Sequence, residues 1–146
     1  MLKEKLLELF NENGGVVKCS TLRRSNRITF TVTPDGKGFV CDKGPAVFPF
    51  DAMDALEYEM KIVAKYNKGK VYYGANASRN GIKLGAEPWF ENTIDCILAR
   101  RVFNRKDGDS VYAASTFIAA LLEKVGFAKM NSTDSTDAFV VLTGKF

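Results

Sequence analysis

The segment from residue 27 to residue 41 constrains the fold most, because it predicts two strands joined by a tight turn. Residues 27–33 alternate in polarity and are rich in β-branched side chains, which is typical of a strand. Residues 34–38 contain one proline and two glycines, and this composition favours a turn, since proline presets φ and glycine accepts a positive φ. Residues 39–41 then form the returning strand. Local antiparallel pairing of this kind favours an α+β fold over a parallel sheet built from βαβ units.

The rest of the sequence predicts about four helices and further short strands. Apolar residues at helical spacing, with Asp51 as an N-cap and Pro88 as a first helical residue, place the helices at 2–10, 51–68, 88–101 and about 111–125. Strands are expected at 71–73, 82–84, 127–131 and 138–142, the last two forming a hairpin. We therefore expect a single globular α+β domain over residues 1–146, with short antiparallel β-hairpins.

The composition is that of an ordinary globular protein. Hydrophobic residues make up 46% of the 146 residues, and 11 are phenylalanine, which is enough to build a packed core. The longest apolar runs fall short of the ~18 residues that a membrane span needs, and the first ten residues do not form a secretory signal. Three scattered cysteines fit reduced thiols. These features predict a cytoplasmic protein with no membrane partner.

The chain contains no histidine, and this limits the chemistry that it can perform. Histidine is the usual general base and metal ligand near neutral pH, so a Ser-His-Asp site, a Cys-His site and a His-ligated zinc are all excluded. Cys19, Cys41 and Cys96 are too few for a four-thiolate site. The sequence therefore predicts no catalytic residue, no metal and no cofactor, and it favours a protein that is not an enzyme.

An enzymatic alternative stays open through the carboxylates of the predicted loops and caps. It requires the fold to gather two or more of Asp35, Asp42, Asp51, Asp107 and Asp109 in one cleft. Pro34-Asp35 followed by Glu59-Met-Lys61 resembles the Pro-Asp…Glu-x-Lys pattern of restriction-type nucleases. That pattern implies a metal-dependent nuclease whose Glu and Lys share one face of a strand. Here the segment is predicted to be helical, and residues i and i+2 of a helix diverge.

Clusters of arginine with nearby tyrosines support a first hypothesis, a nucleic-acid-associated binding or regulatory protein. The net charge is +4, and single-stranded nucleic acid is bound by cations for the phosphates and aromatic faces for the bases. The candidate binding residues are Arg23, Arg24, Arg27, Tyr72, Tyr73, Arg79, Arg100, Arg101 and Arg105. Arg100 and Arg101 have another explanation, because cations near the end of a helix stabilise its dipole.

The last third of the chain supports a second hypothesis, a protein-interaction module. Residues 121–127 followed by a hairpin that ends at residues 140–143 resemble the end of a winged-helix domain, where a recognition helix precedes a wing. The helix expected at 111–125 is apolar almost all round and has no lysine or arginine before Lys124, so it would pack on its own core or on a protein partner. A small inhibitor, an adaptor or a self-associating subunit fits this pattern. Compact, motif-poor proteins of phages and mobile elements are similar.

Overall fold

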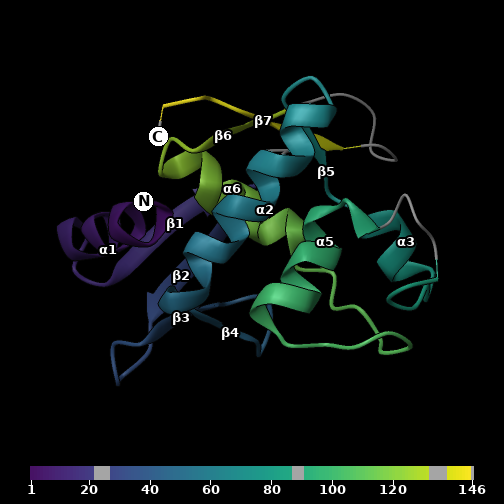
Figure 1. The fold of residues 1–146 in the computed structure, drawn as a ribbon. Helices are drawn as coiled ribbons and strands as arrows, with labels where there is room; N and C mark the ends of the chain where they lie inside the picture. Colours follow the sequence, from purple (N-terminus) through teal and green to yellow (C-terminus); the bar gives the residue numbers. More distant parts are fainter. Residues whose placement is uncertain (22–26, 87–90, 132–137, 146) are drawn as a thin grey trace.

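The structure is a computed structural model that describes residues 1–21, 27–86, 91–131 and 138–145, and it has an α+β fold (Figure 1). The described helices are α1 (Leu2–Glu12), the 3-10 turn η1 (Phe50–Ala52), α2 (Met53–Tyr66), α3 (Ala75–Arg79), α5 (Ile94–Ile97), the π-helical turn η2 (Leu98–Val102) and α6 (Ser115–Lys124). The described strands are β1 (Val16–Ser20), β2 (Arg27–Val32), β3 (Gly38–Cys41), β4 (Val47–Pro49), β5 (Lys70–Tyr72), β6 (Ala128–Met130) and β7 (Phe139–Leu142).

The hairpin expected from residue 27 onward forms the middle of the first sheet. This sheet is antiparallel in the order β1-β2-β3-β4, and Thr31 of β2 pairs with Val40 of β3. Thr33 N–H donates to the carbonyl of Gly38 at 2.9 Å, and the Asp35 carboxylate accepts from Lys37 N–H at 3.0 Å. Proline and glycine therefore make the turn that their conformational preferences predict.

The second sheet joins the C-terminal hairpin to a strand from the middle of the chain. Its order is β5-β7-β6, and all pairings are antiparallel. Val140 of β7 lies opposite Val71 on one side and Met130 on the other. The predicted pairing of β6 with β7 is confirmed, and its connecting segment 132–137 lies outside the described residues.

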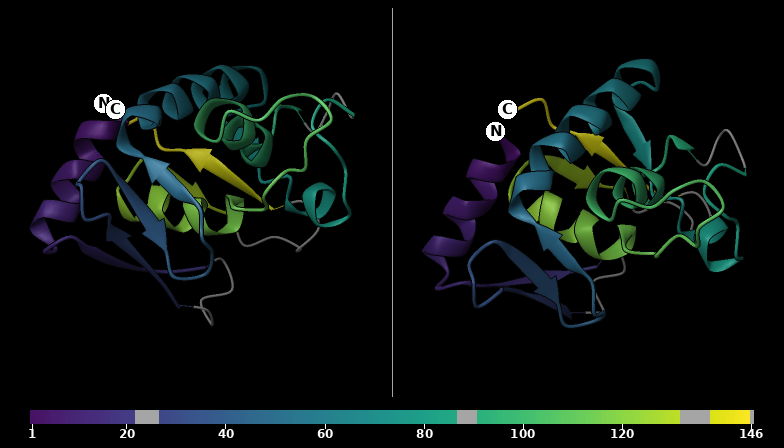
Figure 2. Two further views of the ribbon diagram at one scale, coloured as in Figure 1. Left: turned by 90° about the horizontal axis from the view of Figure 1, so that it is seen from below. Right: turned by 60° about the horizontal axis from the view of Figure 1, so that its bottom comes forward.

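The helix α6 lies between the two sheets, where it contacts β1 on one side and β6 on the other (Figure 2). The helix α2 crosses the middle of the molecule and packs against α1, α5, η2 and the second sheet (Figure 1). Apolar side chains from both ends of the chain, from Leu2 to Val140, belong to one buried cluster. The prediction of a single domain is consistent with this cluster and stays a prediction.

Phe39 of β3 lies at the centre of an aromatic group that joins four elements to it. Its ring centroid is 5.2–5.8 Å from those of Phe10, Phe30, Phe48 and Phe50, which come from α1, β2, β4 and η1. All five rings are buried. Aromatic pairs at these separations add stabilisation beyond the burial of their area.

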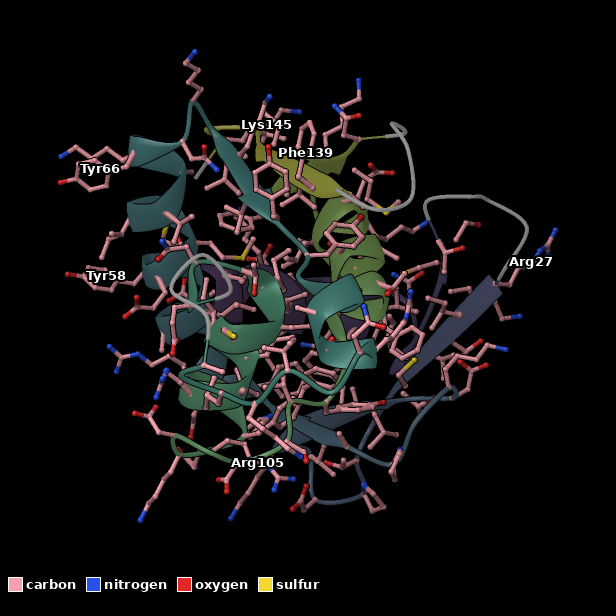
Figure 3. All side chains as sticks on the ribbon, turned by 90° about the vertical axis from the view of Figure 1, so that its right-hand side faces the viewer. Arg27, Tyr58, Tyr66, Arg105, Phe139 and Lys145 are labelled. Carbon is pink, nitrogen blue, oxygen red and sulfur yellow. The ribbon has the colours of Figure 1, made fainter. Side chains whose placement is uncertain are left out.

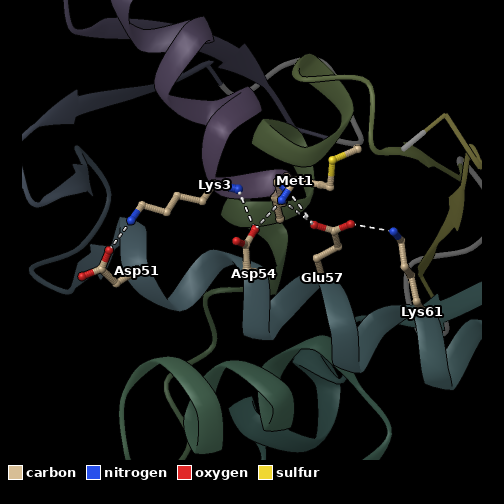
Figure 4. Close-up of polar contacts among 7 residues, drawn as sticks. Met1, Lys3, Asp51, Asp54, Glu57 and Lys61 are labelled. Carbon is tan, nitrogen blue, oxygen red and sulfur yellow. Dashed lines mark hydrogen bonds and ion pairs between the residues drawn. The ribbon is translucent and has the colours of Figure 1, made fainter.

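Carboxylates of α2 hold the beginning of α1 (Figure 4). Glu57 accepts from Leu2 N–H at 2.7 Å, and Asp54 accepts from Lys3 N–H at 3.1 Å. These amides open the first turn of α1, where no carbonyl of the same helix can accept from them. The hydrogen bonds also place negative charge at the positive end of the α1 dipole and hold the pKa of Asp54 below its ordinary value. The inner face of α2 thus orients α1.

Three of the predicted element boundaries are wrong, for reasons that lie in distant contacts. The expected strand at 82–84 is absent, because Leu84 bonds to the loop at 108–109 through both its N–H and its carbonyl. The fourth helix begins at Ser115 and not at residue 111, because the carboxylate of Asp95 accepts from Ser115 N–H. Asp51 is not the cap of α2, since it lies inside η1 and pairs with Lys3.

The expected third helix is also not continuous over its described part. The start predicted at Pro88 lies outside the described residues. Further along, Thr93 adopts an extended conformation with ψ of 160°, and its hydroxyl accepts from Cys96 N–H at 3.4 Å. Thr93 is therefore the N-cap of a new helix, α5, which continues into η2.

We expect Phe39→Ala to lower the free energy of unfolding by about 3–5 kcal/mol, because it leaves a cavity among four rings. Urea denaturation followed by circular dichroism measures this loss. The matched control is Tyr66→Ala, which truncates an 82% exposed ring and should change stability by less than about 0.5 kcal/mol. Equal losses for the two variants would contradict a central role for Phe39.

Candidate nucleic-acid interface

The predicted basic residues are spread over several sides of the molecule. Arg23 and Arg24 lie outside the described residues. Arg27 is exposed at the start of β2, and Figure 3 shows it on the side opposite Tyr58 and Tyr66. Arg79 is exposed at the end of α3, where its guanidinium is 3.4 Å from the hydroxyl of Thr116. Arg27 therefore lies away from the face that carries Tyr58 and Tyr66 (Figure 3).

The two tyrosines predicted to stack on bases are held by the second sheet. Tyr73 is only 3% exposed, and burial raises the pKa of its hydroxyl. Tyr72 is half-buried, with its ring centroid 5.3 Å from that of Phe139. Burial removes Tyr73 from the surface that base stacking requires, and packing against Phe139 occupies part of Tyr72.

Arg100, Arg101 and Arg105 do come together, around a surface hollow of about 450 Å³. The hollow lies where η2 packs against α2, and its remaining lining comes from Glu59, Glu91, Cys96 and Ile97. One of the three predicted arginine clusters is thus brought together by the fold, and the structure adds two glutamates to it.

Glutamate partners neutralise two of these arginines. Arg100 binds Glu91 through two hydrogen bonds, one of them 2.8 Å from Nε to Oε2, and it also reaches Asp107 at 2.6 Å. These contacts raise the pKa of Arg100 above its ordinary value. Arg101 donates from Nε and Nη2 to Oε1 of Glu59, at 3.1 and 2.6 Å. Within the described part of the chain, the guanidinium of Arg105 makes no hydrogen bond or ion pair, so it can bind a ligand.

Next to the hollow, α2 exposes a row of side chains that the sequence reasoning missed. Tyr58, Ile62 and Tyr66 are 64%, 39% and 82% exposed, and their spacing of four residues aligns them along one face. Figure 3 shows Tyr58 and Tyr66 pointing away from the molecule on the same side. The buried residues Met53 and Met60 lie on the opposite face of the helix. A helical projection of residues 53–66 would have found this row, which we call the tyrosine stripe.

The helix proposed to bind a protein partner is instead a core helix. Its buried side chains pack inside this chain, and they belong to Ser115, Ile118, Ala119, Ala120, Leu121 and Leu122. The order of α6, β6 and β7 matches a recognition helix followed by a wing. Because α6 lies between both sheets, however, these buried residues offer no surface to a partner or to a DNA groove, and Phe117 of the same helix is half-buried.

A buried carboxylate, Asp95, joins the elements behind the hollow. It is 0% exposed, and its two oxygens accept from Ser78 Oγ at 2.7 Å and from Ser115 N–H at 2.8 Å. Burial raises its pKa to about 6, although these donors stabilise the charged form. The arrangement ties α3, α5 and α6 together, and we interpret it as structural.

The carboxylates that would support an enzyme are engaged separately. Asp35 accepts within its own turn, Asp42 accepts from Thr29 N–H, and Asp109 accepts from Lys106 N–H. Asp51 pairs with Lys3, and Asp107 pairs with Arg100. In the described ranges, no three carboxylates or thiols are arranged to hold a metal ion. Glu59 and Lys61 both lie on α2 and bind different partners, Arg101 and Glu57, as expected for diverging positions of a helix.

No family model, curated protein or solved structure matches this chain. Among the described residues, there is no helix with the length and apolar character that crossing a membrane requires. The function must therefore be argued from the surface itself.

We expect the wild type to lose stability as the pH rises from 4 to 7.5, and we expect Asp95→Asn not to show this loss. The folded pKa of about 6 lies above the ordinary value of 3.8, so folding favours the protonated acid. The associated stabilisation is complete below about pH 4 and is lost as the pH rises through 6. The stability of the wild type relative to Asp95→Asn should therefore fall by up to about 3 kcal/mol between pH 4 and pH 7.5.

Urea denaturation of both proteins across this pH range measures the difference. Ser78→Ala removes a donor to the carboxylate, so it should move the midpoint to higher pH. A difference between wild type and Asp95→Asn that is constant with pH would contradict the assignment.

Proposed function

We propose that this protein is a non-enzymatic, nucleic-acid-associated protein that binds single strands along the outer face of α2. The observation that supports this function is the tyrosine stripe, because two well-exposed rings on a rigid helix lie beside a group of cations. Cations for the backbone and ring faces for the bases are the two requirements for binding single strands without sequence preference. A regulatory role in the cytoplasm belongs to the same proposal.

The rings are suited to stacking because they are exposed and rigidly positioned. Tyr58 and Tyr66 are two helical turns apart, roughly 12 Å along the axis, and Ile62 lies between them. An amphipathic ring that is largely exposed leaves apolar area in water, and a stacked base would cover that area. Stacking accepts every base, since every base has an aromatic face.

Positive charge borders the stripe on both sides. Lys65 and Lys68 are exposed at the C-terminal end of α2 and just beyond it, and the ammonium of Lys61 nearby is 2.6 Å from Oε2 of Glu57. On the other side, Glu59 connects α2 to Arg101, and Arg105 lines the same hollow. The acidic residues of α2 outside this region, Asp54 and Glu57, are occupied by the start of α1. A phosphate backbone that follows the stripe would therefore meet mainly cations.

This proposal keeps the predicted class of function and revises the residues. Arg105 remains from the original candidates, while Arg100 is held between Glu91 and Asp107 and Arg101 is held by Glu59. The stacking role passes from Tyr72 and Tyr73 to Tyr58 and Tyr66. Removing both rings, by Tyr58→Ala with Tyr66→Ala, should weaken binding of a labelled single strand by about tenfold or more, because each stacked base contributes about 1–3 kcal/mol. Fluorescence polarisation with DNA and RNA strands measures this loss.

Two matched controls separate stacking and charge from general damage. Tyr58→Phe with Tyr66→Phe keeps the rings and should keep the affinity. Lys65→Gln should reduce the slope of log affinity against log salt by about 0.7, the value for one phosphate contact on a single strand. Arg27→Gln removes the same charge on the opposite side of the molecule and should leave the slope unchanged (Figure 3).

The competing function is a protein-interaction module, now through the same stripe instead of α6. Apolar anchors at i, i+4 and i+8 are also the pattern by which a helix binds a groove in a partner or in a second copy. Self-association lost in Tyr58→Ala with Tyr66→Ala, together with no binding of DNA or RNA at low salt, would replace the proposed function with this one. Sedimentation velocity at several protein concentrations measures the self-association.

A further inference from the structure

We propose that the hollow beside the tyrosine stripe binds a guanine base of the bound strand, through Glu59 and Arg105. This inference rests on the proposed function and adds a base preference to it. It is based on the hydrogen-bonding capacity that remains once the ion pairs of the hollow are formed.

Most of the polar groups around the hollow already have partners. Arg100 and Glu91 bind each other through two hydrogen bonds, so neither has its main donor or acceptor sites free. Arg101 uses Nε and Nη2 on a single oxygen of Glu59, Oε1. Within the described part of the chain, Oε2 of Glu59 accepts no hydrogen bond, and the guanidinium of Arg105 donates none. One carboxylate oxygen and one complete guanidinium therefore remain available in the same hollow.

This pair of groups requires a ligand that both donates and accepts hydrogen bonds. A phosphate group only accepts, so it would leave the free oxygen of Glu59 without a donor. Guanine offers two neighbouring donors, N1–H and the 2-amino group, which match a carboxylate. Because Oε1 of Glu59 is taken by Arg101, both donors would converge on the free oxygen Oε2. Guanine also offers two acceptors, O6 and N7, and these match the fork of an arginine. The other bases present fewer matching sites, since none of them combines two adjacent donors with two adjacent acceptors.

The remaining lining of the hollow suits a flat heterocycle. The hollow, at about 450 Å³, is large enough for a base, and Ile97 contributes apolar area to its lining, with Cys96 fully buried beside it. Burial raises the pKa of the Cys96 thiol to about 12, so this residue adds no negative charge at neutral pH. Binding sites for small planar groups typically combine such apolar area with a few fixed polar groups.

The test compares single strands of identical length that differ in one central base within a thymine background. We expect the strand with guanine to bind about tenfold more tightly than the strand with inosine, which lacks the 2-amino donor. We expect a similar difference from 7-deazaguanine, which lacks the N7 acceptor, since a hydrogen bond to a charged group is worth roughly this factor. Fluorescence polarisation with wild-type protein gives both ratios.

Two variants test which residue causes each affinity ratio, that of guanine to inosine and that of guanine to 7-deazaguanine. Glu59→Gln should abolish the preference for guanine over inosine, because a neutral amide oxygen accepts hydrogen bonds more weakly than a charged carboxylate oxygen. Arg105→Gln should abolish the preference over 7-deazaguanine. Glu8→Gln makes the same charge change on an exposed side chain of α1, away from the hollow, and should keep both preferences.

The outcomes separate this inference from the proposed function. Equal affinities for guanine, inosine, 7-deazaguanine and thymine strands, with binding still dependent on Tyr58 and Tyr66, would overturn the guanine site and leave the proposed function standing. A guanine preference that survives both Glu59→Gln and Arg105→Gln would also overturn it. If none of the strands binds at low salt, the inference and the proposed function both fail.

Discussion

The carboxylate of Asp95 is a costly group to bury, and the middle of the molecule is arranged around it. A charged or protonated acid at 0% exposure is destabilising unless its oxygens accept hydrogen bonds. Here one oxygen binds Ser78 in α3 and the other binds the first amide of α6, while the backbone N–H of Asp95 donates to the carbonyl of Tyr73 after β5. This one residue thus fixes where α6 begins between the two sheets. It also orients α5, from which the arginines of η2 follow directly along the chain.

The helix α2 serves two different purposes on its two faces. Its inner face contributes Met53, Met60 and other apolar side chains to the core, and its first turns hold the amides that open α1. Its outer face has no such role, and it carries Tyr58 and Tyr66 in water. A helix that is immobilised by packing on one side can present exposed rings with little loss of conformational freedom on binding. This contrast between the two faces is why the function is proposed there.

Sequence reasoning succeeded where the interactions are local. The strand at residues 27–32 and its turn were predicted because the turn is made by Pro34, Gly36 and their neighbours. The start of α6 could not be predicted, since its capping carboxylate is 20 positions away. For the candidate site, the sequence identified Arg101 but could not show its pairing with Glu59, which is 42 positions away. Tyr72 and Tyr73 were proposed because they are close to arginines in the sequence, and their burial could not be foreseen, since it depends on the whole fold.

The first sheet ends at β4, a strand of only three residues whose last residue is Pro49. Pro49 lies opposite Gly38 and has no N–H to donate. A further strand approaching this edge would find a short ladder that cannot be completed, so the sheet cannot readily extend into a neighbouring molecule on this side. The exposed rings of α2 are therefore not accompanied at β4 by an open strand edge that could pair with another molecule.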